Sequence, residues 1–215
     1  MWGKYYGASC VKLTGEETGV KIVCLDLEGV LVPEIWIGLA EKTGIEELRL
    51  TTRDISDYDV LMTRRIEILH EQGLRISDIH DVIDSLDPLP GARDFLDRLR
   101  ASVQVAILSD TFYQFAEPLM RKLNWPSLYC NDLDIDNQGR VTGYRLRQPD
   151  QKRQVVRAFK QLNYEVVAAG DSYNDLSMLT EAEAGVLFRP PEQLVEEYPQ
   201  FPVTRTHDEL HAALM

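Results

Sequence analysis

The chain has 215 residues, of which 44% are hydrophobic, so it is long enough for one globular domain or for a core domain with a small insert. Its formal charge of −12 at pH 7 repels nucleic acid and anionic membranes, which excludes both as partners. An anionic substrate would be repelled too, so its site would need a cation placed locally.

The first twenty residues show neither a helical nor a strand period, and they lack the apolar segment of a signal peptide. We expect residues 1–20 to form a flexible N-terminal tail. The spacings of Cys10, Cys24 and Cys130 match no metal motif and favour a reducing, cytoplasmic setting. No uninterrupted apolar stretch is long enough to span a bilayer.

From residue 21 the pattern becomes regular. The segment "KIVCLDL" (21–27) is apolar and partly β-branched, which predicts a buried strand. The segment "PEIWIGLAEKTG" (33–44) has apolar residues at helical spacing and ends in glycine, which predicts a helix. Residues 45–87 carry charged helical patterns and no strand run. We therefore expect a helical cap over residues 35–87, inserted after the first strand.

The chain returns to the core at "PLPG" (88–91), a helix-breaking sequence. The segments "ARDFLDRLR" (92–100), "FYQFAEPLMRKL" (112–123) and "KRQVVRAFKQL" (152–162) predict helices. Buried strands are predicted at "VQVAILSD" (103–110), "YEVVAAG" (164–170) and "AGVLF" (184–188). The segment between 128 and 146 predicts two short strands around a turn.

Strands that alternate with helices predict an α/β fold with a Rossmann-like parallel sheet and helices on both faces. We assign residues 21–34 and 88–215 to this core domain and residues 35–87 to the cap. In such sheets the ligand binds beyond the carboxyl ends of the strands. The segments "LDLEG", "LSDT" and "GDSYND", which end three predicted strands, should therefore converge on one site.

Polar side chains follow each of these strands, and a lysine opens the helix after the two short strands. The set comprises Asp26, Glu28, Ser109, Asp110, Lys152, Asp171, Asn174 and Asp175. Carboxylates grouped without histidine or cysteine are hard oxygen ligands that suit Mg²⁺. Mg²⁺ and a lysine together would neutralise a phosphate group in so acidic a protein.

These residue types predict phosphoryl transfer. An aspartate beside a cation can attack phosphorus and form an aspartyl phosphate, and Asp26 is our candidate nucleophile. Glu28 would enter the same space if the chain turns at Gly29, and it would protonate the leaving oxygen and then deprotonate a water. Ser109 and Lys152 would hold the phosphoryl oxygens, where charge must be stabilised.

Each of these residues alone also has a purely structural explanation. Asp26 and Glu28 suit a strand-end turn, Ser109 a helix cap, and residues 170–175 a loop with an N-cap. Lys152 alone is typical of a solvated surface lysine. Their occurrence in this order, each at a predicted strand end or helix start, favours the catalytic interpretation.

The four groups resemble the motifs of the haloacid-dehalogenase-like phosphatases. The first motif of that family, Asp-x-Asp-x-[Thr/Val], is similar to residues 26–30, and its fourth, Gly-Asp-[Ser/Gly]-x-x-Asp, to residues 170–175. Its second, a Ser or Thr after a strand, is read as Ser109, and its third, a Lys or Arg, as Lys152. All four occur in order.

The resemblance implies a Mg²⁺-dependent phosphatase. It implies metal ligation by the carboxylates of Asp26 and Asp171 and by the backbone carbonyl of Glu28, with Asp175 behind them in the metal site. It also implies that the backbone N–H of Asp110 binds the phosphoryl group beside Ser109 and Lys152. Asn174 would lie near the phosphate.

Within that superfamily the chain looks like the phosphoserine phosphatases, and closely like the bifunctional phosphoserine phosphatase/homoserine phosphotransferase type. This implies O-phospho-L-serine as the substrate and homoserine as a second phosphoryl acceptor. Glu34, in "VPE", matches the acid that receives the substrate amine. Arg65, in "RRIEIL", matches the arginine that receives the carboxylate, and Arg64 is the adjacent alternative. A site that binds an amino acid needs an anionic group for the ammonium and a cationic group for the carboxylate.

One position departs from the family pattern. Most members have Asp where this chain has Glu28, whose extra methylene moves the carboxyl further from the backbone. The homoserine-transferring subgroup has "DLEG", as here. We hypothesise that Glu28 still protonates the leaving serine oxygen and favours phosphoryl transfer to a bound alcohol over transfer to water.

Several alternatives stay open. Other small phosphomonoesters are open as the natural substrate, and both water and homoserine are open as the acceptor. A signalling receiver domain also has an acidic Mg²⁺ pocket, a phosphorylated Asp, a Ser/Thr and a Lys, but the helical insert and Glu28 disfavour it. A dinucleotide-binding fold would need a Gly-x-Gly-x-x-Gly turn, which residues 26–34 lack. The oligomeric state is unreadable, so a homodimer is also open.

Overall fold

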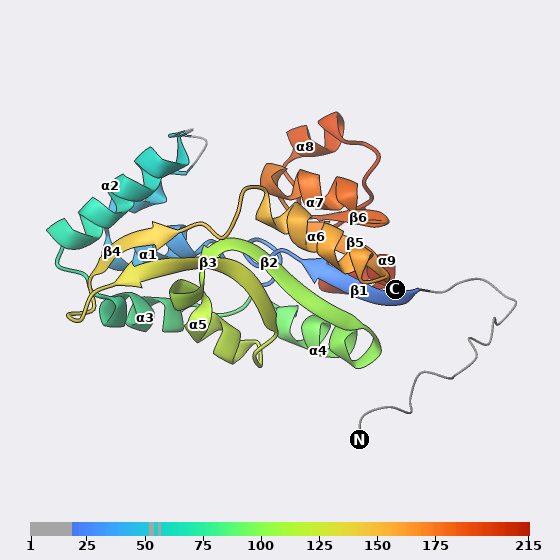
Figure 1. Cartoon of the computed structure of the whole chain (residues 1–215), viewed down its shortest axis with the longest axis horizontal. Coiled ribbons are helices and arrows are strands. Elements are labelled where there is room, and N and C mark those ends of the chain that lie inside the picture. Colours follow the sequence, from blue (N-terminus) through green and yellow to red (C-terminus); the bar gives the residue numbers. More distant parts are fainter. Residues whose placement is uncertain (1–18, 52–53, 56) are drawn as a thin grey trace, which may run out of the picture.

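A computed structural model of the chain describes residues 19–51, 54–55 and 57–215. The predicted tail, residues 1–20, lies outside this range except for its last two residues, and Val20 already opens strand β1 (Val20–Leu25). The insert follows as four short helices (Figure 1). They are α1 (Ile35–Thr43), η1 (Glu46–Arg49), α2 (Tyr58–Glu71) and α3 (Ile76–Asp84).

The rest of the chain alternates helices and strands as predicted. The elements are α4 (Ala92–Ser102), β2 (Gln104–Phe112), α5 (Tyr113–Lys122), β3 (Ser127–Ile135), β4 (Val141–Arg145), α6 (Gln151–Gln161), β5 (Tyr164–Gly170), η2 (Tyr173–Asp175), α7 (Leu176–Glu181), β6 (Ala184–Phe188), α8 (Glu192–Glu197), β7 (Val203–Thr204) and α9 (His207–Leu214). The last three were not predicted. Within the described ranges, no helix combines the length and apolarity needed to cross a membrane.

The strands form one sheet in the order β4-β3-β2-β1-β5-β6-β7. All neighbouring pairs are parallel except β3 and β4, so the predicted α/β fold is confirmed. The two short strands predicted between 128 and 146 extend this sheet, because β3 pairs with β2. Strand β1 lies between β2 and β5, where the strand order reverses direction, and ligands bind at such a point.

Helices cover both faces of the sheet (Figure 1). Val23 and Leu25 of β1 pack into the hydrophobic cluster that includes α4, α5 and α9. Ile22 and Cys24, which point the other way, pack into the cluster with α6, α7 and α8. Alternate side chains of a strand face opposite sides, so this buried central strand needs apolar residues throughout.

The helical insert shares the larger of these two clusters with the core. Leu39 of α1, Met62 of α2 and Ile79 of α3 are buried in the same cluster as Phe115 of α5. The ring of Trp36 also meets Phe115 edge to face, with centroids 5.0 Å apart. The insert is therefore packed against the carboxyl edge of the sheet, on the side of α5.

Candidate active site

The three predicted strand ends meet at one cavity. Asp26 follows β1 and Asp171 follows β5, and the Asp26 N–H donates to Ala169 O at 2.9 Å, which ties these two strands together at their ends. The cavity has a volume of about 230 Å³. It is lined by Asp26, Glu28, Glu34, Trp36, Ile37, Thr51, Tyr58, Leu61, Arg65, Asp110, Thr111, Phe112, Lys152, Asp171, Ser172 and Asn174. The insert and the core both contribute walls.

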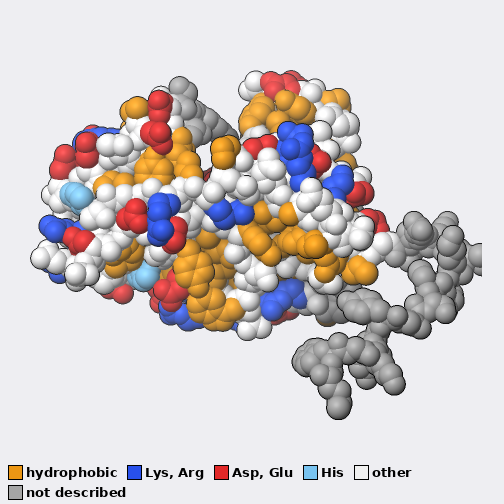
Figure 2. All heavy atoms as spheres, viewed as in Figure 1, with side chains coloured by type: hydrophobic (Ala, Val, Ile, Leu, Met, Phe, Trp, Pro, Cys, Tyr) orange, Lys and Arg blue, Asp and Glu red, His pale blue; other side chains and the backbone are white. Residues whose placement is uncertain are grey.

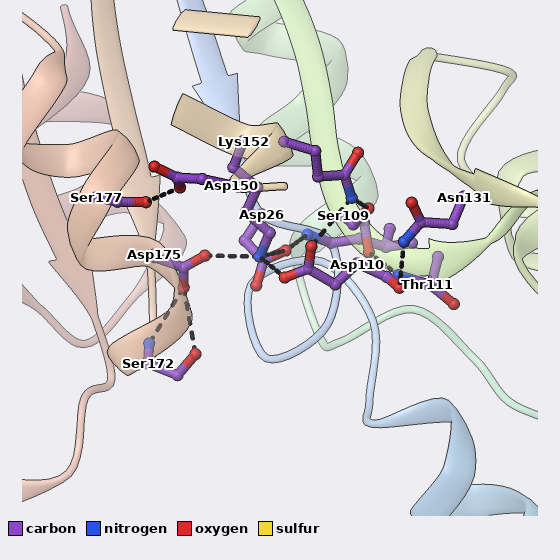
Figure 3. A network of polar contacts seen from close by, with 12 residues as sticks. Asp26, Ser109, Asp110, Thr111, Asn131, Asp150, Lys152, Ser172, Asp175 and Ser177 are labelled. Carbon is purple, nitrogen blue, oxygen red and sulfur yellow. Dashed lines mark hydrogen bonds and ion pairs between the residues drawn. The ribbon is translucent and has the colours of Figure 1, made fainter. Parts of the chain in front are cut away.

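Lys152 lies at the centre of the acidic group (Figure 3). Its Nζ is buried and lies 2.9 Å from Asp26 Oδ1 and 2.7 Å from Asp175 Oδ1. Asp110 Oδ2 is 3.5 Å away on the other side. Burial opposes the charge on Lys152, but Asp175, Asp26 and Asp110 outweigh it and raise the pKa of the ammonium. Lys152 is therefore a fixed positive charge and not a solvated surface lysine.

Asp175 shapes the turn after β5. Its Oδ2 accepts the backbone N–H of Asp171 at 2.9 Å and that of Ser172 at 3.2 Å. Gly170 has no room for a side chain, because a Cβ there would lie 2.3 Å from Asp175 Cγ. Since its Oδ1 binds Lys152, both oxygens of Asp175 are occupied.

A tight loop brings Glu28 to the cavity that Asp26 also lines. Gly29 has a φ of +78°, a conformation that favours glycine, and a Cβ there would lie 2.3 Å from Asp171 Oδ2. The Gly29 N–H donates to Val32 O at 2.8 Å, which closes the loop. Glu28 Oε2 accepts the N–H of Ile35 at 3.0 Å, at the start of α1. The predicted turn at Gly29 is confirmed.

The end of β2 is irregular. Leu108 pairs with Tyr129 and Phe112 with Asn131, so residues 109–111 loop out of the ladder. Ser109 is buried, and its Oγ accepts the Thr111 N–H at 3.2 Å. Figure 3 shows Ser109 and Asp110 on the side of Lys152 away from Asp175.

The carboxyl groups around the cavity are hard to ionise. Burial first, and then the charge of Asp175, raise the pKa of Asp26. Burial and Asp175 also raise the pKa of Asp171 to about 7. Burial and the neighbouring Glu34 raise the pKa of Glu28 to about 8. A carboxyl group with a raised pKa can act as an acid, and Glu28 lines the same cavity as Asp26.

Three of these carboxylates come close enough to share one cation. Oxygen atoms of Asp26, Asp171 and Asp175 all lie within 4.8 Å of one another. One lysine against three carboxylates leaves net negative charge in a buried space, which a hard divalent cation would neutralise. The donor set, all oxygen, fits such an ion.

The far wall of the cavity carries two opposite charges. The Arg65 guanidinium is buried over the Trp36 ring, 4.4 Å from its centroid, and donates through Nη2 to Leu50 O at 2.7 Å. Its Nε is buried and has no hydrogen-bond partner. Burial lowers the pKa of Arg65 to about 10, which keeps it charged. Glu34 is exposed and lines the same cavity.

Arg64, the adjacent alternative, lies elsewhere. It is on the outer face of α2, where its guanidinium pairs with Glu47, Glu67 and Glu71 at 3.1–3.5 Å. Arg65 is thus the arginine of the pair that faces the cavity.

Comparison with known proteins identifies the family. Residues 20–183 match the haloacid dehalogenase-like hydrolases. The chain belongs to this family. "Phosphoserine phosphatase ThrH" of Pseudomonas aeruginosa is 61% identical over 191 residues, which cover 89% of this chain and 93% of that protein. A phosphoserine phosphatase of Pseudomonas syringae pv. tomato is 61% identical over 194 residues, which cover 90% of this chain and 82% of that protein.

Solved structures show the same fold. A phosphoserine phosphatase in apo form aligns with a TM-score of 0.72 and 21% identity, over 89% of this hydrolase and 97% of that chain. The phosphoserine phosphatase from T. onnurineus aligns with a TM-score of 0.69 and 22% identity, over 91% of this chain and 94% of that one. The receiver-domain and dinucleotide-binding alternatives are set aside, because the family match runs through the insert and all four motifs.

The structure of this hydrolase brings all the predicted site residues to the cavity or to its immediate wall. Ser109 lies behind the surface, while Asp110 and Thr111 line it. Sequence reasoning missed Trp36, Tyr58 and Gln151. For Trp36 and Tyr58 the only sequence signal was an aromatic residue on the same predicted helix as a candidate binding residue. Trp36 follows Glu34 closely, and Tyr58 precedes Arg65. Gln151 carries no signal beyond its place next to Lys152.

Proposed function

We propose that the protein hydrolyses O-phospho-L-serine to L-serine and phosphate through an aspartyl phosphate on Asp26. The observation that carries this proposal is the buried Arg65, which lines the same cavity as the Asp26–Lys152 pair. Among the described residues its guanidinium has no carboxylate partner, and a buried cation without a counter-charge favours an anionic ligand group in the cavity. The two relatives named as phosphoserine phosphatases, each 61% identical, support the same substrate.

In the first step an oxygen of Asp26 attacks phosphorus, and the bond between phosphorus and the serine oxygen breaks. Glu28 gives its proton to that oxygen, so serine leaves neutral at its hydroxyl. The raised pKa of Glu28 is consistent with this role as the acid. Lys152, Ser109 and the backbone N–H of Asp110 hold the phosphoryl oxygens.

In the second step Glu28 takes a proton from a water, and the water oxygen attacks phosphorus. The bond between phosphorus and Asp26 breaks, which releases phosphate and restores both carboxyl groups. Glu28 can serve both steps because the bond from the Ile35 N–H holds its carboxyl group at the cavity that Asp26 lines. Asn174 lines the cavity and is exposed, and we propose that it lies near the phosphoryl group of the bound substrate.

Magnesium is the cation that we propose for the acidic group. The carboxylates of Asp26 and Asp171 and the backbone carbonyl of Glu28 would hold it. Asp175 completes the group, but both of its oxygens are already bonded, so we place it behind the ligands as the residue that positions Asp171. When bound, Mg²⁺ would neutralise charge on the nucleophile and on the phosphoryl oxygens.

The opposite end of the cavity would bind the amino-acid part of the substrate. Arg65 would pair with the carboxylate and Glu34 with the ammonium. We also propose that residues 35–87 act as a cap over the core, residues 21–34 and 88–215, and exclude water before attack. A reducing, cytoplasmic setting remains our proposal from the cysteine pattern.

A second acceptor, homoserine, is favoured by one feature. Glu28 replaces the usual Asp, and its longer side chain reaches the N-terminus of α1, at the junction with the insert. We propose that this carboxyl can deprotonate a bound alcohol as well as water. Homoserine, which is serine lengthened by one methylene, would use the same Glu34 and Arg65.

The test is phosphate release from O-phospho-L-serine with Mg²⁺, with and without homoserine. The Asp26→Asn variant serves as the control. We expect rapid release that this variant loses, and phosphohomoserine at the expense of free phosphate when homoserine is present. Cleavage of an aryl phosphate without turnover of phosphoserine would refute the roles of Glu34 and Arg65. Phosphoserine turnover by Asp26→Asn at the parent rate would refute the nucleophile.

A further inference from the structure

The side chain of Gln151 is buried beside the site and has no part in the steps above. Its Nε2 donates to Ser109 O at 2.5 Å and to Asp110 Oδ1 at 3.0 Å. Its Oε1 accepts from Arg147 Nη2 at 2.9 Å. Every polar atom of this amide therefore has a partner, and two of its three bonds go to the end of β2. A polar side chain buried and bonded in this way fixes what it touches.

The bond to Ser109 O determines the direction of the next N–H. The peptide between Ser109 and Asp110 is trans, so its C=O and N–H point in opposite directions. Because the C=O faces Gln151, the Asp110 N–H faces away from Gln151. Asp110 and Thr111 both line the cavity, so we infer that this N–H is directed to it. Asp110 is outside the paired positions of the ladder, because residues 109–111 loop out between Leu108 and Phe112 of β2.

The following peptide is held as well. Asn131 of β3, which is buried, donates from Nδ2 to Asp110 O at 3.0 Å. The Arg147 N–H donates to Asn131 Oδ1 at 3.0 Å, which fixes the orientation of that amide. Figure 3 shows Asn131 and the segment from Ser109 to Thr111 gathered on one side of Lys152. Two side-chain amides thus clamp the peptides before and after the Asp110 Cα.

We propose that Gln151 is a positioning residue for phosphoryl binding. It holds the Ser109–Asp110 peptide so that the Asp110 N–H donates to a phosphoryl oxygen. The bond that Gln151 makes to the C=O also polarises the peptide and strengthens its N–H as a donor. Gln151 itself touches neither substrate nor metal. The proposal rests on the proposed function only in its phosphoryl ligand, not in the serine part.

The variant that tests this is Gln151→Glu, which keeps the shape but places acceptor oxygens against Ser109 O and the Asp110 carboxylate. We expect kcat/KM to fall about 10- to 100-fold for both phosphoserine and p-nitrophenyl phosphate, because one oxyanion donor is misdirected. Inhibition by inorganic phosphate should weaken by a similar factor. Inhibition by L-serine, which has no phosphoryl group, should not change.

Gln114→Glu is the matched control. Gln114 is a partly buried amide at the start of α5. It donates to Asp132 Oδ1 at 2.6 Å and accepts the Leu133 N–H at 3.0 Å, so its bonds go to β3 and not to Ser109. The Gln114→Glu variant should be less stable than the parent, but inorganic phosphate should inhibit it as strongly as it inhibits the parent. If Gln151→Glu does not fold, Gln151→Met removes the donor without adding charge, and the same loss of phosphate inhibition is expected.

Unchanged phosphate inhibition in a folded Gln151 variant would overturn the proposal, and so would equal weakening of phosphate and serine inhibition. A parent enzyme that cleaves only the aryl phosphate would contradict the proposed substrate instead, and the aryl phosphate and phosphate data would then decide the role of Gln151. If the parent cleaves neither, calorimetric titration with inorganic phosphate and Mg²⁺ compares the parent with Gln151→Glu. Equal affinities would overturn the proposal.

Discussion

At the scale of single residues, Arg64 and Arg65 are neighbours in sequence with opposite environments. Arg64, on the outer face of α2, pairs with one glutamate of η1 and two of α2, while Arg65 is buried over Trp36 in the cavity wall. Exposed ion pairs contribute little, whereas a buried guanidinium without a counter-charge is costly, which is why we propose Arg65 for the substrate carboxylate. The helical period puts only one of the two on the cavity side.

This difference predicts a matched pair of variants. Arg65→Lys keeps the charge but loses the planar fork, so kcat/KM for phosphoserine should fall roughly 10- to 100-fold. Cleavage of p-nitrophenyl phosphate, which has no carboxylate, should stay within about twofold, and Arg64→Lys should change neither substrate. Steady-state kinetics of both variants on both substrates measures this. Equal losses on the two substrates would contradict carboxylate recognition by Arg65.

Glu28 carries the second prediction at this scale. Its longer side chain reaches the Ile35 N–H, and Glu28→Asp would draw the carboxyl back from that bond. We expect the ratio of phosphohomoserine to free phosphate to fall, because the acid then activates water in preference to the larger alcohol. Product analysis at a fixed homoserine concentration gives the ratio. An unchanged ratio would refute the link between Glu28 and acceptor choice.

At the scale of elements, α9 ties the insert to the core through His207. The buried imidazole lies 2.9 Å from Val30 O and 3.2 Å from Pro90 O, through its two ring nitrogens. These carbonyls belong to the two segments that lead into and out of the insert. The ring also packs between Phe95 and Phe188, with centroids 5.2 Å and 4.8 Å away. One side chain therefore holds both connections.

His207→Ala should consequently destabilise the protein by about 2–4 kcal/mol, since it removes the ring that contacts both carbonyls and opens a cavity beside Phe95 and Phe188. His211→Ala, one turn further along α9 at a partly exposed position, should cost much less. Urea unfolding of both variants measures the difference. Equal losses would mean that the effect belongs to α9 in general and not to the bonds of His207.

The elements also show what the sequence can and cannot predict. The buried strands and the catalytic carboxylates are readable because apolar runs that end in acids are local patterns. The pair β3–β4 was predicted, but its place in the main sheet was not, because pairing with β2 is a long-range contact. Strand β7 has two residues, too few to show a period. The proposed role of Gln151 could not be predicted, because it depends on the direction of the Ser109 carbonyl, and the irregular end of β2 sets that direction.

At the scale of the whole molecule, the chain has a net charge of −12 and yet groups the carboxylates of Asp26, Asp171 and Asp175 around the buried Lys152. Figure 2 shows acidic and basic side chains interspersed over the visible face. Repulsion within this buried acidic group lowers the free energy of unfolding, and a bound cation would offset that repulsion. Stability and metal binding should be coupled.

We expect Mg²⁺ at about a hundredfold above its Kd to raise the melting temperature by about 5 °C or more. Asp171→Asn should melt higher than the parent in EDTA, because it removes repulsion with Asp26 and Asp175, and it should lose most of the Mg²⁺ effect. Differential scanning fluorimetry with and without Mg²⁺ measures both. A parent-like Mg²⁺ shift in Asp171→Asn would contradict its role as a ligand.

The measurement that tests the central claim most directly is acid quenching during turnover of O-phospho-L-serine, followed by mass spectrometry of the peptides. We predict one phosphoryl group on Asp26, absent from Asp26→Asn and more abundant when the second step is slowed in Glu28→Gln. A phosphoryl group on another residue would contradict the account. So would rapid release of phosphate with no covalent intermediate trapped in either the parent or Glu28→Gln.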